Sequence, residues 1–287
     1  MSKVLITGGA GNIGSVLAKK LLDLGEHVLV ADNLSTGSLK NLPEVGFIKC
    51  DVNTERFRGS FDYIFHLAAV VGVKRTQENP ISVLNDINGI RNILNMGAKR
   101  VFFASSSEVY GEPVSIPQNE EKTPLNSRLP YAVVKNVGEA FCRSYHQEQG
   151  QEYTIFRIFN TYGPNQSDDF VIPRFVKAAK NNEDITIYGD GSQTRTFTHV
   201  NDTVDTFVNC LYNNKAINDV VNVGSDKLIS ILDLAKLIIK TFNSKSKIVF
   251  LPPLKDGDMT RRQPDNKKMM EILNRDLISL EEGLWQI

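Results

Sequence analysis

Short apolar runs alternate with segments of helical periodicity through the first 160 residues of the chain. In one such segment, over residues 12–24, Leu17, Leu21 and Leu24 recur on one helical stripe, and Gly25 follows as a stop signal. Strands that are buried on both faces and separated by helices indicate parallel βαβ units with right-handed crossovers. The predicted strands cover 3–7, 27–32, 45–51, 62–69, 100–106 and 153–159, and the other predicted helices cover 79–96 and 131–149.

The pattern becomes less regular after Asn160, where Pro164 opens an irregular segment. Helical and strand-like segments then alternate without the earlier regularity. We therefore predict an α/β fold, with a Rossmann-type doubly wound parallel sheet over 1–160 and a smaller α+β lobe over 161–287 that binds the substrate. In the lobe, the predicted helices cover 172–181, 201–213 and 230–242, and the predicted strands cover 185–188, 220–224 and 247–251.

Charge and cysteine content narrow the class of protein. The chain has 33 basic and 33 acidic residues among 287, so its formal net charge is zero, which gives no sign of nucleic-acid or membrane-surface binding. Its three cysteines are scattered without metal-ligand spacing, so we expect a cytoplasmic protein with no bound metal. The first residues lack a signal-peptide pattern, and no apolar run approaches the ~18–20 residues of a membrane span.

Three glycines at a spacing of three lie between the first predicted strand and the first predicted helix, in "ITGGAGNIGS" (6–15). Gly8 suits a backbone shape that most residues avoid, Gly11 lets the chain approach a pyrophosphate, and Gly14 lets the helix sit close to the strand. The helix N-terminus would offer free N–H groups to the phosphates. A plain tight turn is the alternative.

Asp32 ends the second predicted strand, about 18 residues after the last of these glycines. A carboxylate at this place can accept hydrogen bonds from an adenosine ribose and would repel a 2′-phosphate, which favours NAD over NADP. In the alternative interpretation, Asp32 only caps the turn that follows.

A second pattern joins a tyrosine to a lysine four residues later, in "YAVVK" (131–135). On a helix these side chains share one face, and the charge of Lys135 would lower the pKa of the Tyr131 phenol. Upstream, "ASSSEVYG" (104–111) follows a predicted strand and places Ser106 where it can hydrogen-bond the same substrate oxygen. The three residues together would take a proton from an alcohol while hydride leaves its carbon for NAD.

The series of motifs resembles the extended short-chain dehydrogenase/reductase family, in particular its NAD-dependent nucleotide-sugar epimerases and dehydratases. The likeness runs through nearly the whole chain and also includes "DNLSTG" (32–37), "HLAA" (66–69), "RIFNTYGP" (157–164), "VIPRF" (171–175) and "YGDGSQTRTFTHVND" (188–202).

The resemblance implies roles for individual residues. Tyr131 would be the general base, Lys135 would also hold the nicotinamide ribose, and Ser106 would contact the sugar 4-hydroxyl. Asn160 would bind on the phosphate side, and Arg195 and Arg261 would pair with the diphosphate; for both arginines a surface ion pair is the alternative. The catalytic candidates are Ser106, Glu108, Tyr131 and Lys135. The cofactor candidates are Gly8, Gly11, Asn12, Ile13, Gly14, Asp32, Asn33, Ser35, Thr36, Gly37, Asp51, Val52, Leu67, Ala68, Ala69, Ala104, Ser105, Tyr131 and Lys135. The substrate candidates are Ser106, Asn160, Val171, Arg174, Arg195 and Arg261.

Members of the family begin by oxidising the C4 alcohol of a sugar, and three outcomes can follow. We predict a UDP-hexose 4-epimerase with resident NAD. Glu108 keeps a UDP-glucuronate decarboxylase or a UDP-sugar dehydratase as the alternative, although Ser107 stands where dehydratases carry an aspartate proton donor. The sequence "RRQPD" (261–265) is similar to that of decarboxylases. A second alternative is a protein that binds NAD and nucleotide sugars without catalysis.

Two further expectations come from the resemblance. Many relatives carry Asn-x-x-Gly-Thr on the helix before the fifth strand, whereas Asp86 and Ile90 replace the Asn and Thr here, which argues against a cofactor or bracing contact at position 86. Relatives often form homodimers in which two helices, here 79–97 and 130–149, build a four-helix bundle. We therefore expect a homodimer.

Overall fold

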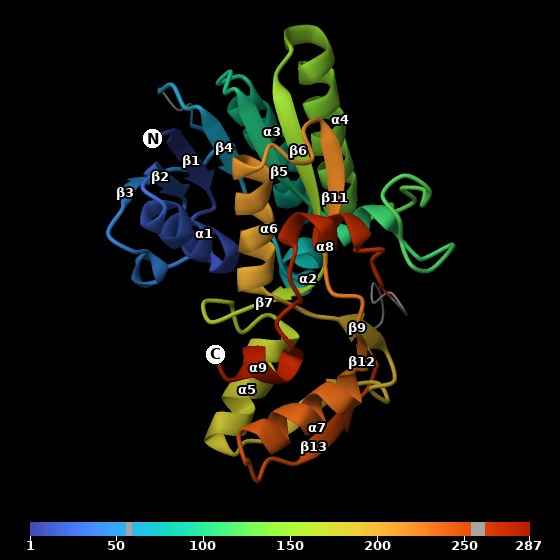
Figure 1. Cartoon of the computed structure of the whole chain (residues 1–287). Helices are drawn as coiled ribbons and strands as arrows, with labels where there is room; N and C mark the ends of the chain where they lie inside the picture. The colour runs from blue at the N-terminus through green and yellow to red at the C-terminus, as the bar shows by residue number, and fades with distance from the viewer. Residues whose placement is uncertain (56–58, 254–261) are drawn as a thin grey trace.

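Seven parallel strands form the central sheet of the computed structural model, which describes residues 1–55, 59–253 and 262–287 (Figure 1). Their order across the sheet reverses direction next to β1, as in doubly wound folds. The predicted α/β fold class is therefore confirmed. In spatial order the strands are β11 (Asp219–Val223), β6 (Glu152–Ile158), β5 (Arg100–Ser106), β4 (Tyr63–His66), β1 (Lys3–Thr7), β2 (His27–Asp32) and β3 (Gly46–Lys49).

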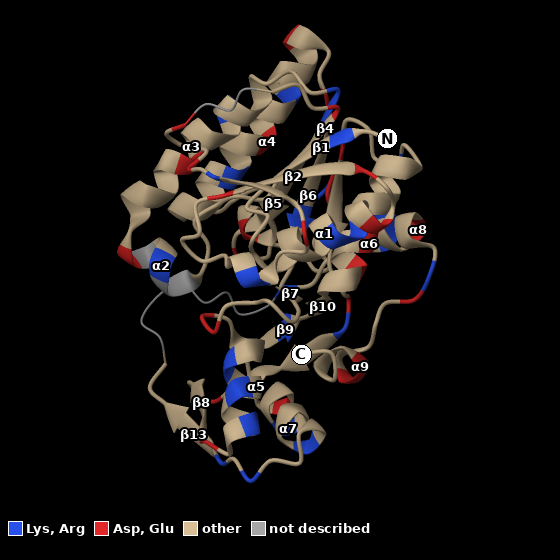
Figure 2. Ribbon diagram, turned by 90° about the vertical axis from the view of Figure 1, so that its left-hand side faces the viewer, with Lys and Arg blue, Asp and Glu red and all other residues tan. Residues whose placement is uncertain are grey.

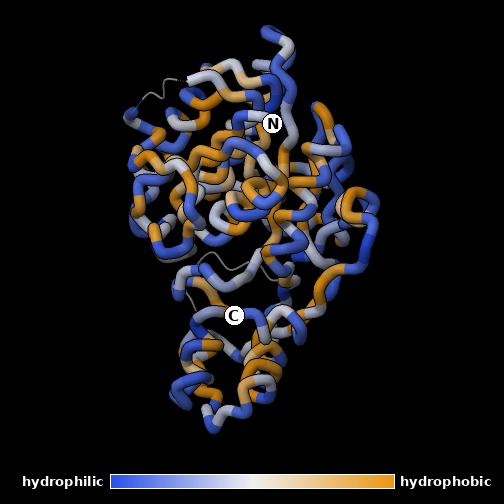
Figure 3. Tube along the Cα trace, turned by 60° about the vertical axis from the view of Figure 1, so that its left-hand side comes forward, coloured by the Kyte–Doolittle hydropathy of each residue, from blue (hydrophilic) through white to orange (hydrophobic). Residues whose placement is uncertain are grey.

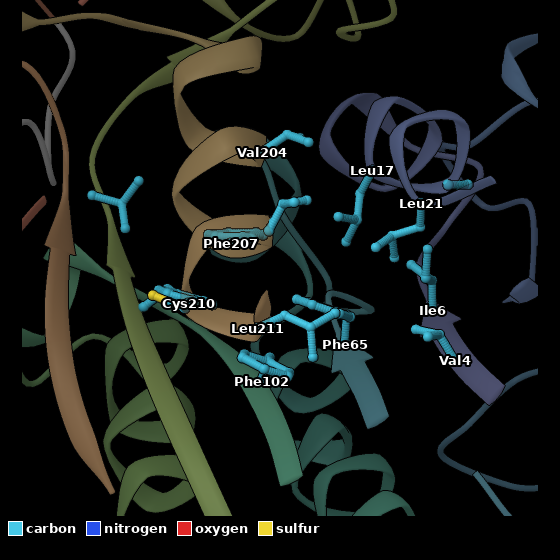
Figure 4. Packing of buried hydrophobic residues seen from close by; sticks show 14 of the residues in the cluster. Val4, Ile6, Leu17, Leu21, Phe65, Phe102, Val204, Phe207, Cys210 and Leu211 are labelled. Carbon is cyan, nitrogen blue, oxygen red and sulfur yellow. The ribbon is translucent and has the colours of Figure 1, made fainter. Parts of the chain in front are cut away.

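Helices cover both faces of this sheet. On one face α1 (Asn12–Asp23) and α6 (Val200–Tyr212) lie side by side and pack on β1, β4 and β5 (Figure 4). The rings of Phe65 and Phe102 stack here with centroids 4.3 Å apart. On the other face α3 (Pro80–Leu94) and α4 (Pro130–Gln149) form the second part of the core. Because both faces are covered, the central strands are continuous apolar runs instead of alternating ones.

A smaller layer lies beyond the carboxyl ends of the strands (Figure 1). Its core comes from α5 (Val171–Asn181) and α7 (Ile231–Thr241), and hydrophobic segments run through the interior of both layers (Figure 3). Around this core lie the parallel pair β8 (Ile185–Tyr188) and β13 (Ile248–Leu251), the antiparallel pair β9 (Thr194–Thr196) and β12 (Leu228–Ser230), the parallel pair β7 (Thr161–Tyr162) and β10 (Thr198–His199), and α9 (Leu280–Leu284).

The chain after residue 160 does not stay in the small layer. The segment predicted as a lobe strand over 220–224 is β11, which pairs in parallel with β6 at the edge of the main sheet. Helices α6 and α8 (Lys267–Leu273) also pack on the main layer. The placement of this strand in the lobe was therefore wrong, because a short apolar run carries no information about its pairing partner. Several elements were not predicted, among them the two C-terminal helices, the short strand pairs of the small layer other than β8 with β13, the short helix α2 (Val73–Glu78) and the 3-10 turns η1 (Leu39–Asn41) and η2 (Ser107–Tyr110).

Basic and acidic residues are interspersed over both layers, in keeping with their equal numbers (Figure 2). Within the described ranges, no helix is long and apolar enough to span a bilayer.

Candidate active site

The turn between β1 and α1 brings the spaced glycines against the end of β4. Gly8 has a φ of +68°, and a Cβ at this residue would lie 2.6 Å from the backbone nitrogen of Ala68. A Cβ at Gly14 would lie 2.5 Å from the carbonyl oxygen of Gly8, so the helix approaches the turn this closely only with glycine there. A Cβ at Gly11 would have only that same oxygen within 4 Å, at 3.5 Å. Gly11 therefore faces open space beside the helix.

Helix α1 begins directly after Gly11 and has no side-chain cap. Its first N–H groups are thus available to an outside acceptor. A side chain at Gly11 would fill the space next to these donors, so glycine keeps it open for a close-lying anion. This combination fits the pyrophosphate of a dinucleotide.

Asp32 ties this turn to the next one. One carboxylate oxygen accepts the N–H of Ala10 at 2.9 Å, and the other accepts the N–H of Leu34 at 2.7 Å. The residue is 8% exposed. Asp32 therefore does cap the turn that follows it, as the alternative interpretation had it. This does not exclude binding of a ribose, because each carboxylate oxygen can accept a second hydrogen bond. The loop over 33–37 then folds back, and a Cβ at Gly37 would lie 2.9 Å from Ala10.

Strands β3 and β4 are shorter than predicted, and β4 ends beside the glycine turn. Strand β4 ends at His66, so residues 67–69 leave the sheet, although Leu67 still donates its N–H to the carbonyl of Thr7. After β3, Val52 is buried, and its carbonyl accepts a hydrogen bond from Asn92 on α3 at 2.9 Å. The expected cofactor residues of both loops thus lie at the same edge of the sheet, where ligands of doubly wound folds bind.

Tyr131 and Lys135 lie on the first turns of α4, and β5 ends beside them at Ser106. The Lys135 ammonium donates to the carbonyl of Ala104 at 2.8 Å and lies 5.6 Å from the centre of the Tyr131 ring. The hydroxyl of Ser106 also interacts with the phenol of Tyr131. The structure therefore brings together the three residues that the two sequence motifs predicted.

The charge state of these residues differs from the expectation. Burial raises the pKa of Tyr131 above its usual value, the nearby charges of Glu108 and Asp86 raise it further, and the Ser106 hydroxyl and Arg262 oppose this. Burial also lowers the pKa of Lys135 to about 8. The predicted lowering of the Tyr131 pKa by lysine was wrong for the chain by itself, because the cost of desolvating a phenolate exceeds the lowering by the Ser106 hydroxyl and by Arg262.

Glu108, in the 3-10 turn directly after Ser106, forms an ion pair with Arg262 at 2.7 Å. The two side chains are 18% and 10% exposed, so the pair is largely withdrawn from water, and removing one partner would cost more than breaking a surface pair. The neighbouring Arg261, predicted as a substrate residue, lies outside the described residues. The two consecutive arginines in the sequence signalled this site, but the sequence alone did not single out Arg262.

A short parallel bridge between distant segments places Arg262. Gln118 donates its N–H to the carbonyl of Gln263 at 2.8 Å, and the N–H of Asp265 donates to the carbonyl of Gln118 at 2.8 Å. The Asn119 amide adds a hydrogen bond to the Asp265 carboxylate at 3.1 Å. This bridge fixes the "RQPD" segment beside the loop that follows the catalytic turn.

The substrate candidates Asn160, Arg195, Val171 and Arg174 lie at the junction of the two layers. The Asn160 amide donates to the carbonyl of Thr196 at 3.0 Å, so it holds strand β9 against the main layer. Arg195 in β9 is 7% exposed and donates to the Thr194 carbonyl, so it is not the surface arginine of the alternative interpretation. Helix α5 begins at Val171, and its Arg174 carries a buried Nε with no hydrogen-bond partner in the described part of the chain.

Ser105, predicted to line the cofactor site, uses its side chain inside the protein instead. Its hydroxyl donates to Glu139 on α4 at 2.7 Å, and Glu139 forms a bidentate ion pair with Arg157 of β6. Burial raises the pKa of Glu139, but Arg157, with help from Ser105 and Arg143, lowers it by more, so the pKa lies below its usual value. Sequence reasoning missed this pair because its members are 18 residues apart in different elements. It fixes α4, which carries Tyr131, against the strands beneath it.

Among the described residues, no group of three or more His, Cys, Asp or Glu side chains is placed to hold a metal ion.

Comparison with known proteins identifies the family. The profile of the NAD dependent epimerase/dehydratase family matches residues 4–224. A UDP-N-acetyl-alpha-D-glucosaminuronate decarboxylase of Bacillus cytotoxicus is 38% identical, over 98% of this chain and 95% of its own length. The structure is similar to a UDP-glucose 4-epimerase from Thermotoga maritima with UDP-glucose (30% identity, 98% and 96% of the two chains, TM-score 0.89). It is also similar to a UDP-glucuronic acid 4-epimerase from Bacillus cereus, solved with UDP-glucuronic acid and NAD (29% identity, 99% and 97%, TM-score 0.88). The chain belongs to the NAD-dependent epimerase/dehydratase family of nucleotide-sugar enzymes, and its cofactor is NAD.

Proposed function

We propose that the protein oxidises C4 of a UDP-linked uronic acid and removes the C6 carboxylate as carbon dioxide. The observation that carries this proposal is the Glu108–Arg262 ion pair, which lies two residues from Ser106. A plain exchange of configuration at C4 needs no charged group near C5 or C6. An arginine beside the catalytic turn is the donor best suited to a planar carboxylate. The similarity to a decarboxylase acting on a UDP-linked uronic acid supports the same reaction.

The residues around C4 would work as a proton-transfer unit. Tyr131 takes the proton of the 4-hydroxyl as hydride leaves C4, and Ser106 donates a hydrogen bond to the same oxygen. Bound NAD supplies the hydride acceptor, and its cationic ring lowers the cost of forming a phenolate at Tyr131. Lys135, held on the Ala104 carbonyl, keeps a cation next to the Tyr131 ring.

The carboxylate would then leave without further acid–base help. Once C4 is a ketone, the C6 carboxylate is β to a carbonyl, so the C5–C6 bond breaks and its electron pair becomes the C4–C5 enolate. The Ser106 and Tyr131 hydroxyls stabilise the enolate oxygen. Carbon dioxide departs as this bond breaks, the enolate takes a proton from solvent at C5, and return of hydride to C4 with the proton held by Tyr131 gives a UDP-pentose.

The pairing of Arg262 with Glu108 suits this step. Negative charge moves from the carboxylate to the C4 oxygen during decarboxylation, so a full counter-charge on the carboxylate would stabilise the starting material more than the transition state. Glu108 partly neutralises Arg262, which can then orient the carboxylate without holding it too tightly.

4-Epimerisation is the second candidate, and the likeness to solved 4-epimerases supports it. In this case Arg262 would recognise a carboxylate that remains on the sugar. Mass spectrometry of the products from UDP-glucuronate separates the two. Loss of the mass of carbon dioxide supports decarboxylation, whereas an unchanged mass with an inverted C4 supports epimerisation.

Variants extend this experiment. We expect Glu108→Gln and Arg262→Gln to reduce carbon dioxide release at least about tenfold while oxidation at C4 persists. Glu148→Gln, an exposed carboxylate change on the far end of α4, serves as the matched control. Decarboxylation at full rate in both site variants would contradict the proposed role of the pair.

We also propose a homodimer formed through α3 and α4. These two helices pack side by side and expose Ile81, Leu84 and Val133, which are 76%, 42% and 38% exposed. Light scattering after size exclusion tests this: Ile81→Glu together with Leu84→Glu should give a monomer. A wild type that is already monomeric at micromolar concentration would contradict it.

A further inference from the structure

Asp86 on α3 braces the two loops that approach the cofactor. One of its carboxylate oxygens accepts the N–H of Val70 at 2.7 Å, and the other accepts the amide of Asn53 at 3.0 Å. Val70 directly follows the loop after β4, and Asn53 directly follows Val52 after β3. The expectation that position 86 makes no bracing contact was therefore wrong, and the replacement of the usual asparagine by aspartate calls for a physical explanation.

The hydrogen bonds around this residue require an acceptor at both oxygens. The side-chain oxygen of Asn53 accepts the N–H of Gly89 at 3.1 Å, which turns its amide nitrogen towards Asp86. The second partner of Asp86 is a backbone N–H, which can only donate. A carboxylate satisfies both donors, whereas an asparagine would place its own NH₂ group against one of them. The geometry thus selects the ionised form.

This anion is buried, and its field reaches the catalytic end of the site. Asp86 is 7% exposed. Its charge raises the pKa values of both Lys135 and Tyr131. Burial raises the pKa of Asp86 itself, with Asp51 adding to this, and the two hydrogen bonds and Lys135 oppose the rise. A fixed negative charge, held by Val70 and Asn53, therefore lies within electrostatic reach of Lys135, the residue that would hold the nicotinamide ribose.

We propose that Asp86 is a positioning residue whose charge favours the oxidised cofactor over the reduced one. The nicotinamide ring is a cation in NAD⁺ and neutral in NADH, so a nearby buried carboxylate stabilises only the oxidised form. An enzyme that uses its cofactor as a resident oxidant is then returned to its working state after each turnover. The inference depends on the NAD site and not on which reaction follows oxidation at C4.

The test compares the dissociation constants of NAD⁺ and NADH for wild type and Asp86→Asn, measured by titration calorimetry. Loss of bracing weakens both cofactors alike, whereas loss of charge weakens NAD⁺ alone. At an effective dielectric constant of about 20, one charge within roughly 10 Å changes a binding constant about tenfold. We therefore expect the ratio of the NADH constant to the NAD⁺ constant to fall about tenfold.

Two further variants separate charge from structure. The double variant Asn53→Asp with Asp86→Asn keeps the hydrogen bonds, because the new carboxylate at position 53 accepts from Gly89 and from the new amide at position 86, whose oxygen accepts from Val70. It moves the charge towards the adenine side, so the ratio should fall in the same direction but less. Asn53→Ala removes one bracing bond and keeps the charge, so the ratio should stay at the wild-type value.

The double variant carries the test if Asp86→Asn does not fold. The proposal is overturned if the ratio stays within about twofold of wild type in Asp86→Asn and in the double variant while the binding of both cofactors weakens equally. Asp86 would then only hold the two loops in place.

Discussion

Replacing Glu139 with glutamine should destabilise the protein strongly. Glu139 is fully buried, and its carboxylate receives the Ser105 hydroxyl and two nitrogens of Arg157 at 2.7 to 2.9 Å. Arg157 is also buried, with 3% of its side chain exposed. Glutamine keeps the shape but turns an NH₂ group towards one of the donors and leaves the guanidinium charge without its counter-ion.

The expected cost follows from that geometry. Removing one partner of a buried ion pair costs about 3–5 kcal/mol, because the remaining charge stays buried and uncompensated. For a chain of 287 residues, the entropy of unfolding converts this into a fall in Tm of about 5–8 °C. Chemical denaturation monitored by circular dichroism measures the free energy of unfolding directly.

Arg143→Gln is the matched control, since Arg143 also pairs with Glu139, at 3.1 Å, but has 44% of its side chain exposed. It should cost less than about 1 kcal/mol. A cost below about 1 kcal/mol for Glu139→Gln as well would refute the view that this pair fastens α4 to the sheet.

The loss of folding stability at acid pH gives a second test of the Glu139–Arg157 pair. The pKa of Glu139 is lower in the folded protein than in the unfolded chain, so its contribution is present above the unfolded value and is lost as pH falls through the folded one. The wild type should therefore lose more stability on acidification below about pH 4.5 than Glu139→Gln does.

Three other changes test the cofactor and catalytic sites. Gly14→Ala should weaken NAD binding at least about tenfold in titration calorimetry, because its Cβ would lie 2.5 Å from the Gly8 carbonyl oxygen and push α1 away from the turn. Unchanged affinity would contradict the assignment of this turn as the pyrophosphate site. Asp32→Ala should weaken NAD and reduce the preference for NAD over NADP, measured by competition, because two backbone N–H groups lose their acceptor and the repulsion of a 2′-phosphate disappears; an unchanged preference would leave Asp32 a cap only. Lys135→Met should change how the stability of the cofactor-free protein depends on alkaline pH. The pKa of Lys135 is about 8 in the folded protein and about 10.5 in the unfolded chain, so the unfolded chain binds more protons between these pH values. Wild-type stability should therefore rise over this range by up to about 3 kcal/mol relative to the variant. Parallel pH profiles for the two proteins would contradict the buried ammonium.

Much of the site could be predicted because it depends on local geometry. The Tyr131–Lys135 spacing places both side chains on one helix face, and the glycine spacing describes a single turn. The central strands were found because burial on both faces produces continuous apolar runs.

What could not be predicted depends on contacts between distant segments. The ion pair of Glu108 with Arg262 requires the bridge between Gln118 and the 263–265 segment, and no local pattern encodes it. The brace at Asp86 depends on the amide orientation of Asn53, which is set by Gly89. The sign of the Tyr131 pKa shift depends on burial, a property of the packed protein and not of the motif.

The most direct test of the proposed reaction uses UDP-glucuronate with an isotope-labelled C6 carboxylate, followed by nuclear magnetic resonance. If Arg262 and Glu108 orient a departing carboxylate, the label will appear as carbon dioxide and bicarbonate, together with an unlabelled UDP-pentose. If the label stays on the sugar while the configuration at C4 inverts, the protein is a 4-epimerase and the assigned role of the pair is wrong.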